Sequence, residues 1–166
     1  MKTLITILLL MISFLGKAQN EKPERAAFVL KLAVTKKNFY EQNIPVSPYF
    51  VHEKLLQIYP TEKLFIEVEI AGDTISVMKV VKENLKPEST IEIVFTQNVK
   101  DKASESMMLK VNNPFNRKLS YKAFMSVVGS NRWTATSIIP VEPKIGGYEM
   151  WNDVIVSLAL DKWKLE

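Results

Sequence analysis

The chain has 166 residues, with 22 lysines and arginines, 18 aspartates and glutamates, one histidine and no cysteine. The lack of cysteine excludes disulfides, thiol catalysis and thiolate metal sites, and a single histidine excludes metal sites built on several imidazoles. No Asp-rich loop has the spacing of a calcium site, so we predict neither a metal nor a cofactor.

The N-terminus predicts export. A positive charge at Lys2 precedes an apolar run over residues 3–15, and the small side chain of Ala18 stands where signal peptidase cuts. The run is shorter than the roughly 20 residues that span a bilayer. We therefore expect residues 1–18 to be a signal peptide, cleaved before Gln19, and the protein to act in the periplasm or at the cell surface.

Two other interpretations of this N-terminus have less support. A buried helix of a cytosolic protein would carry a polar stripe, which the apolar run lacks. A lipid anchor would require a cysteine at the cleavage site, and the chain has none. The protein is therefore expected to have no stable membrane anchor after cleavage.

Cleavage would remove two lysines and leave 20 basic against 18 acidic residues, a net charge of +2. So small and scattered an excess does not make a nucleic-acid groove, and we expect no nucleic-acid partner. Residues 19–25 are polar and predict a flexible leader. Residues 26–166 are long enough for one domain with its own hydrophobic core.

The segments that follow the leader differ in how regular their apolar periodicity is. Residues 26–35 place their apolar side chains on one parity and predict a strand, with a helix as the alternative. Three prolines break residues 36–60 into an irregular segment, within which residues 49–59 have the apolar spacing of a short helix. Residues 63–70 and 74–81 predict a hairpin with an acidic face at Glu67 and Glu69 that points to solvent.

The second half of the chain predicts strands throughout. Asn113-Pro114 is expected to form a corner, and Gly146-Gly147 a flexible turn. After Asp161 the apolar parity shifts to Trp163, which predicts a bulge. The predicted strands are 91–95, 106–112, 119–128, 133–139 and 154–165.

Seven or eight short strands with polar turns between them predict an all-β fold, an antiparallel immunoglobulin-like β-sandwich. The Cys…Trp…Cys core of immunoglobulin domains is absent, so this inference depends on strand number and alternation. A jelly roll or a small barrel would show the same periodicity and stays open as an alternative.

One segment has a family resemblance. Residues 109–114 (LKVNNP), with Leu119 and Tyr121 after them, are similar to the strand and Asn-Pro turn of late-embryogenesis-abundant type 2 domains. Any sandwich needs a corner of this kind, so the resemblance implies a strand and a turn and no function.

Glu149 and Asp153, with aromatic residues between them, are the most enzyme-like group. A glycosidase uses two carboxylates beside aromatic rings as its acid and base, and His52 would supply a further acid–base group. No nucleophile elbow or other signature accompanies them, acidic residues beside Gly-Gly are ordinary in turns, and a lone histidine is usually a surface residue. An envelope hydrolase that acts on sugar or peptide is therefore the alternative function.

The aromatic residues Trp133, Tyr148 and Trp151 are the candidate ligand-binding residues. Rings that face outward stack on sugars or pack on peptides, whereas a β-sandwich core also needs large side chains, so at least one of the three tryptophans, Trp163 included, should be buried. The leading hypothesis is an exported, non-enzymatic binding or accessory module of the cell envelope. Its partner would be an envelope protein or a glycan, and the addition of an edge strand to another protein is a further form of this function.

Overall fold

A computed structural model describes residues 23–166, so the predicted signal peptide and residues 19–22 lie outside the described part of the chain. Residues 23–166 form strands and no helix, and hence no helix that could cross a bilayer. The all-β prediction is confirmed. The strands are β1 (Glu24–Arg25), β2 (Phe28–Ala33), β3 (Phe39–Ile44), β4 (Ser47–Pro48), β5 (Phe50–His52), β6 (Leu55–Ile58), β7 (Lys63–Ala71), β8 (Thr74–Val81), β9 (Thr90–Lys100), β10 (Ala103–Asn112), β11 (Leu119–Val127), β12 (Trp133–Thr136), β13 (Gly146–Trp151) and β14 (Ile155–Leu165).

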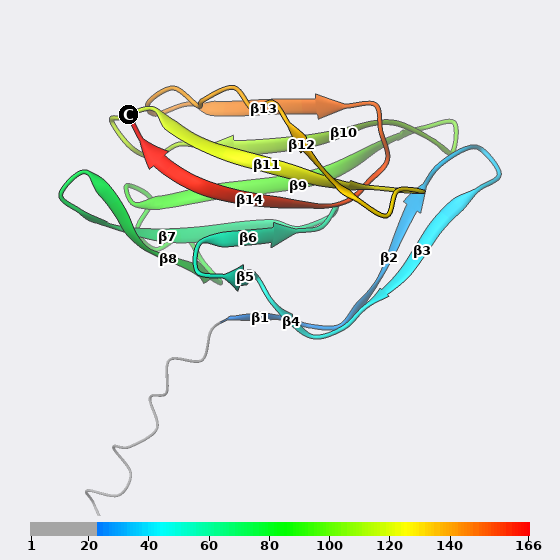
Figure 1. Cartoon of the computed structure of the whole chain (residues 1–166), viewed down its shortest axis with the longest axis horizontal. Coiled ribbons are helices and arrows are strands. Elements are labelled where there is room, and N and C mark those ends of the chain that lie inside the picture. The colour runs from blue at the N-terminus through cyan, green and yellow to red at the C-terminus, as the bar shows by residue number, and fades with distance from the viewer. Residues whose placement is uncertain (1–22) are drawn as a thin grey trace, which may run out of the picture.

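Ten of these strands form two antiparallel sheets of five strands each (Figure 1). The β9 sheet has the order β13-β10-β9-β7-β8, and the β14 sheet has the order β12-β11-β14-β6-β5. Neither sheet closes on itself in the described part of the chain, so the small-barrel alternative is wrong.

One hydrophobic core lies between the two sheets. It forms because every second residue of the longer strands is apolar and points inward, as the alternation predicts. Burial of one such side chain contributes roughly 1.5–3 kcal/mol, so a core of this size stabilises the fold without disulfides. Fully buried members from the two sheets include Ile66, Ile93, Phe95, Leu109, Leu56, Ile58, Leu158 and Leu160.

Strands β2 and β3 form a separate hairpin at one end of the two sheets (Figure 1, right). Its inner side chains, Leu30 among them, pack with Tyr59 and Val156 in a second, smaller core. The side-chain amide of Gln97 on β9 donates to the carbonyl of Ala33 at 2.8 Å and accepts from its N–H at 2.9 Å. One side chain thus pairs with β2 as a strand backbone would.

The side chain of Arg25 connects the N-terminal segment to β6 and to the link between β6 and β7. It is 3% exposed and donates to both carboxylate oxygens of Glu62, at 2.6 and 3.1 Å, and to the carbonyl of Gln57 at 2.7 Å. The guanidinium carbon lies 4.6 and 4.8 Å from the ring centroids of Tyr49 and Tyr59. Residues 24–25 are therefore an ordered strand, where the sequence predicts the end of a flexible leader.

Lys54, in the turn between β5 and β6, joins the two sheets at one margin. Its ammonium donates to the carbonyl of Ile75, at the start of β8, at 2.5 Å. Its own carbonyl accepts from the indole N–H of Trp163 at 3.0 Å. Both contacts run between elements that are far apart in the sequence.

The Asn113-Pro114 corner is confirmed. Asn113 is buried, and its side-chain N–H groups donate to the carbonyls of Arg117, Val141 and Glu142 at 2.8–3.1 Å. Its side-chain oxygen accepts from the N–H of Phe115 at 2.9 Å. Asparagine suits this position because one side chain both donates and accepts.

The predicted hairpin over residues 63–81 and the bulge after Asp161 are also confirmed. The pairing between β11 and β14 changes register beside Asp161, and Lys162 has a φ of 55°. This bulge turns Trp163 into the core, where it is 6% exposed.

Other local predictions are wrong. The short helix over residues 49–59 is absent, because β6 pairs with β14 and β5 pairs with β6. The irregular segment 36–60 therefore contains four strands, β3 to β6. The glycines predicted as a flexible turn begin β13 instead, and a Cβ on Gly147 would lie 2.7 Å from the side chain of Val141.

Candidate binding sites

The three aromatic candidates do not form one platform. Trp133 pairs with Ser126 and lies on the outer side of the β14 sheet, where it is 50% exposed. Tyr148 lies on the outer side of the β9 sheet, on the opposite face of the molecule. Trp151 packs against the core between the sheets, and its indole N–H donates to the hydroxyl of Thr136 at 2.9 Å.

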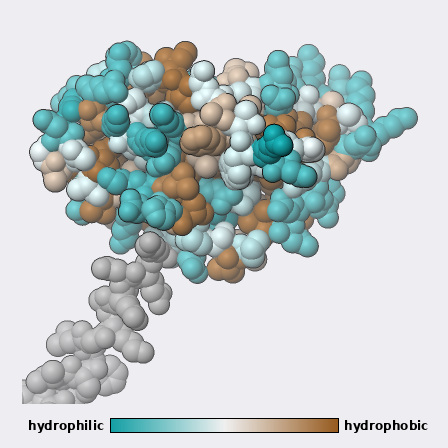
Figure 2. Space-filling view, viewed as in Figure 1, coloured by the Kyte–Doolittle hydropathy of each residue, from teal (hydrophilic) through white to brown (hydrophobic). Residues whose placement is uncertain are grey.

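The face around Trp133 has no continuous apolar surface. Figure 2 shows the side of the molecule that carries β11 and β14, with hydrophobic patches separated by hydrophilic residues. Trp133 alone among the three candidates is exposed on this face. A single half-exposed ring gives a ligand little surface to bind.

The acid–base candidates are not brought together around one cavity. The carboxylate of Glu149 accepts from the N–H of Ile139 at 2.7 Å, and Glu149 lines a cavity described below. Asp153 is exposed in the link between β13 and β14, and His52 is exposed at the end of β5. Neither Asp153 nor His52 lines that cavity, and neither lines the second, larger groove that is also described below. The hydrolase hypothesis stays a prediction to which this geometry adds no support.

A cavity of about 200 Å³, which we call the Tyr148 cavity, lies beside the edge strand β13. Val141 pairs with Leu119 of β11, and the N–H of Ile139 donates to the carboxylate of Glu149 on β13, so residues 137–145 contact both strands. Three large apolar residues on its rim, Ile139, Ile145 and Tyr148, are 75%, 54% and 57% exposed. The lining residues are Tyr121, Ile139, Pro140, Val141, Glu142, Ile145, Gly147, Tyr148 and Glu149.

The polar groups of the Tyr148 cavity are held by the surrounding structure. The ring of Tyr121 stacks on Trp163 with 4.7 Å between centroids. Burial raises the pKa of Tyr121 above its usual value, with a smaller contribution from the carboxylate of Glu149. Glu142, the second carboxylate, forms an ion pair with Lys118 at 2.8 Å.

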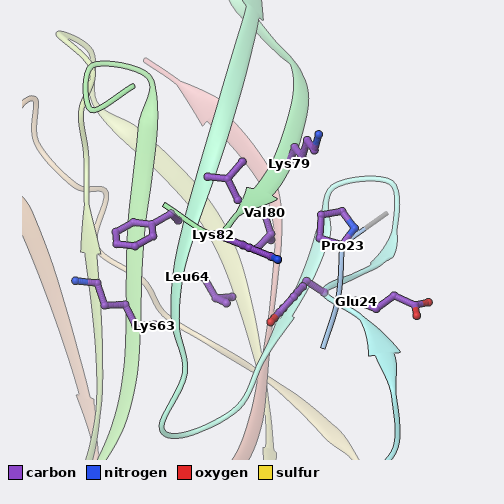
Figure 3. Close-up of a pocket in the computed structure, with 10 residues that line it drawn as sticks. Pro23, Glu24, Lys63, Leu64, Lys79, Val80 and Lys82 are labelled. Atoms are coloured by element: carbon purple, nitrogen blue, oxygen red, sulfur yellow. The ribbon is translucent and has the colours of Figure 1, made fainter. Parts of the chain in front are cut away.

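A larger groove, which we call the basic groove, lies at the other edge of the β9 sheet, beside β8 and β1. It has a volume of about 1140 Å³. Figure 3 shows it between the β7–β8 hairpin and the N-terminal segment. The lining residues are Pro23, Glu24, Tyr49, Lys63, Leu64, Phe65, Lys79, Val80, Val81 and Lys82.

The charged side chains of the basic groove differ in direction. Lys63 is paired with Glu92 at 3.4 Å, and Figure 3 shows its ammonium pointing away from the groove, as does the carboxylate of Glu24. The ammonium of Lys82 points across the groove toward Pro23. Neither Lys82 nor Lys79 forms an ion pair with any residue in the range 23–166.

Sequence reasoning did not find this groove. Its walls come from four separate stretches of the chain, which only the fold brings together. The one local signal was the pair of lysines, Lys79 near the end of β8 and Lys82 directly after it.

Residues 23–166 contain no group of three or more histidine, aspartate or glutamate side chains placed to hold a metal ion. No protein-family model, curated protein or solved structure matches the chain.

Proposed function

We propose that the protein is an exported, non-enzymatic binding module of the cell envelope that recognises a partner protein at the Tyr148 cavity. The observation that supports this is the group of exposed apolar residues, Ile139, Ile145 and Tyr148, around one hollow. Exposed apolar residues that cluster around a cavity are typical of protein–protein contact sites.

The neighbouring surface extends the same contact area. Met150 is 62% exposed and pairs across the strands with Met108, on the side of the β9 sheet where Tyr148 lies. The ammonium of Lys110 lies 5.8 Å from the centre of the Tyr148 ring. Methionine and tyrosine adapt to apolar partners and are common at such interfaces.

The size of the cavity indicates what it receives. A void of about 150 Å³ is enough for a benzene molecule, so the volume of about 200 Å³ suits one large apolar side chain of the partner. The carboxylate of Glu149 and the hydroxyl of Tyr121 would orient a polar atom on that side chain.

The fold that presents this site is, in this proposal, an immunoglobulin-like β-sandwich. In support, the chain passes repeatedly between the two sheets: β6 is followed by β7, β10 by β11, β12 by β13 and β13 by β14. Export is supported by the apolar run over residues 3–15 and by the small side chain at Ala18.

The test is capture of a partner from an envelope fraction, compared between variants. We expect a reproducible protein partner to bind the unaltered protein and the Trp133→Ala control, in which an exposed aromatic residue on the opposite face is removed. Tyr148→Ala and Ile145→Ser should lose it.

Two outcomes would contradict this assignment. Capture that does not depend on Tyr148 would move the site elsewhere on the surface. Binding to a glycan array that is lost with Tyr148→Ala, without a protein partner, would replace the protein by a sugar, because an exposed tyrosine also stacks on sugar rings.

A further inference from the structure

We propose that the basic groove binds an extended, acidic segment of a partner protein, and that this segment adds to the β9 sheet as a strand beside β8. The groove lies at the opposite edge of the β9 sheet from the Tyr148 cavity. The inference therefore does not depend on the function proposed above.

The edge of β8 beside the groove is open. Strand β8 is hydrogen-bonded to β7 on one side, and no strand of residues 23–166 pairs with its other side. The last three residues of β8, Lys79 to Val81, and Lys82 after them line the groove. An unpaired strand edge of this kind is a template for the backbone of an added strand.

The groove has apolar surface on both sides of the β9 sheet. Leu64 and Val80, with 4% and 6% of their surface exposed, belong to the inner side of the β9 sheet and form an apolar part of the lining. Phe65 and Val81, which pair across β7 and β8, supply apolar surface on the outer side. A strand's side chains alternate between two sides, so an added segment would place apolar residues against both surfaces.

The groove also carries positive charge. Lys79 and Lys82 are three residues apart and therefore belong to opposite sides of the strand, and Figure 3 shows them extending in different directions. The carboxylate of Glu24 is turned away, and Glu67, which lies opposite Lys79 in the register, pairs with Lys86. Within residues 23–166 the groove therefore presents positive charge without an ion pair next to apolar surface. Acidic side chains that flank an apolar residue are complementary to this arrangement.

The same features disfavour two other occupants. A second copy of the chain would bring its own Lys79 and Lys82 to the interface, and like charges directly opposite each other oppose pairing. The protein's own N-terminal segment meets the groove at Pro23, which has no backbone N–H to donate to β8.

The experiment uses the purified protein and two labelled peptides of seven residues, in which pairs of valines alternate with pairs of glutamates in one and with pairs of lysines in the other. Each side of an added strand then carries both valine and charged side chains. We expect the acidic peptide to bind, by fluorescence anisotropy, with an affinity that falls as salt is added, and the basic peptide not to bind. The paired variant Lys79→Glu, Lys82→Glu should weaken acidic-peptide binding at least about tenfold.

The matched control is Lys37→Glu, Lys122→Glu, which reverses two exposed lysines elsewhere on the surface. It should change the affinity by less than about twofold, because screening limits the effect of distant surface charges. Amide hydrogen exchange should show new protection at residues 78–81 when the acidic peptide is present.

Several results would overturn the proposal. These are equal binding of both peptides, equal weakening by the two paired variants, or protection that appears away from β8. A dimer that dissociates in the Lys79→Glu, Lys82→Glu variant would mean that a second copy covers the edge, and would also overturn it. None of these results bears on the Tyr148 cavity, which Tyr148→Ala tests separately.

Discussion

The guanidinium of Arg25 and the carboxylate of Glu62 form a two-point ion pair, with N···O distances of 2.6 and 3.1 Å, at a site where 3% of the Arg25 side chain is exposed. Glu62 also accepts from the N–H of Tyr59 at 2.8 Å. Removal of one partner from a buried pair leaves the other charge without compensation. We expect Arg25→Met to lower the free energy of unfolding by about 3 kcal/mol, measured by urea denaturation.

The exposed pair Lys31–Glu41 provides the control for this prediction. Both side chains are more than half exposed, so Lys31→Met should cost less than about 1 kcal/mol. Equal effects of the two substitutions would show that the Arg25 pair does not stabilise the fold.

Asn113 is expected to be hard to replace. Asn113→Ala removes the donors to three carbonyls and the acceptor for Phe115 N–H, and should cost about 2–3 kcal/mol in thermal or urea unfolding. Asn113→Asp keeps the shape, but a carboxylate cannot donate to carbonyls, so it should be as destabilising at neutral pH. If Asn113→Asp left the free energy of unfolding unchanged at neutral pH, the assigned direction of these hydrogen bonds would be wrong.

Tyr121 should make the fold sensitive to alkali. Burial raises the pKa of this phenol above the usual 10.0, so the folded protein holds the proton to higher pH than the unfolded chain does. The resulting stabilisation is complete below about pH 10 and is lost as the pH rises further, by up to about 1.4 kcal/mol per pH unit. Urea unfolding between about pH 8 and pH 11 should show a shallower loss in Tyr121→Phe, which keeps the stacking on Trp163.

Two tryptophans should respond differently to truncation. Trp151→Ala removes a ring that packs on the core and donates to Thr136, and should cost about 3 kcal/mol. Trp133→Ala removes a half-exposed ring and should change the free energy of unfolding by less than about 0.5 kcal/mol. Thermal unfolding of the two variants checks this, and a larger loss for Trp133→Ala would mean that it is packed.

The sequence predicted the strands in which one face is apolar and the other polar. The alternation of Leu64, Ile66 and Val68 located β7, and the shift of parity at Trp163 located the bulge in β14. It did not predict β3, because Ile44 is the one buried residue of the six and Tyr40 the one other that packs against a core, so the strand carries no clear apolar pattern. Nor did it predict β6, whose strand conformation follows from pairing with β14 and not from local preference.

The candidate sites were predictable only in part. Tyr148 was a candidate ligand-binding residue, but its neighbours Ile139 and Ile145 were not, since their exposure depends on how residues 137–145 fold against β13. Gly147 was interpreted as a turn residue, whereas the reason for glycine is the close approach of Val141, a contact across the fold that no local pattern reveals.

The contact between Lys54 and the carbonyl of Ile75 limits how far the edge of the β9 sheet can grow. It occupies the start of β8 and leaves the stretch over residues 78–81 accessible, a length of roughly 13 Å at the usual rise of about 3.3 Å per residue. A long strand from another molecule would meet the Lys54 side chain before it could pair along the whole edge. An uncovered edge can pair with the same edge of another copy and so lead to aggregation. The ammonium group of Lys54 discourages such edge-to-edge pairing.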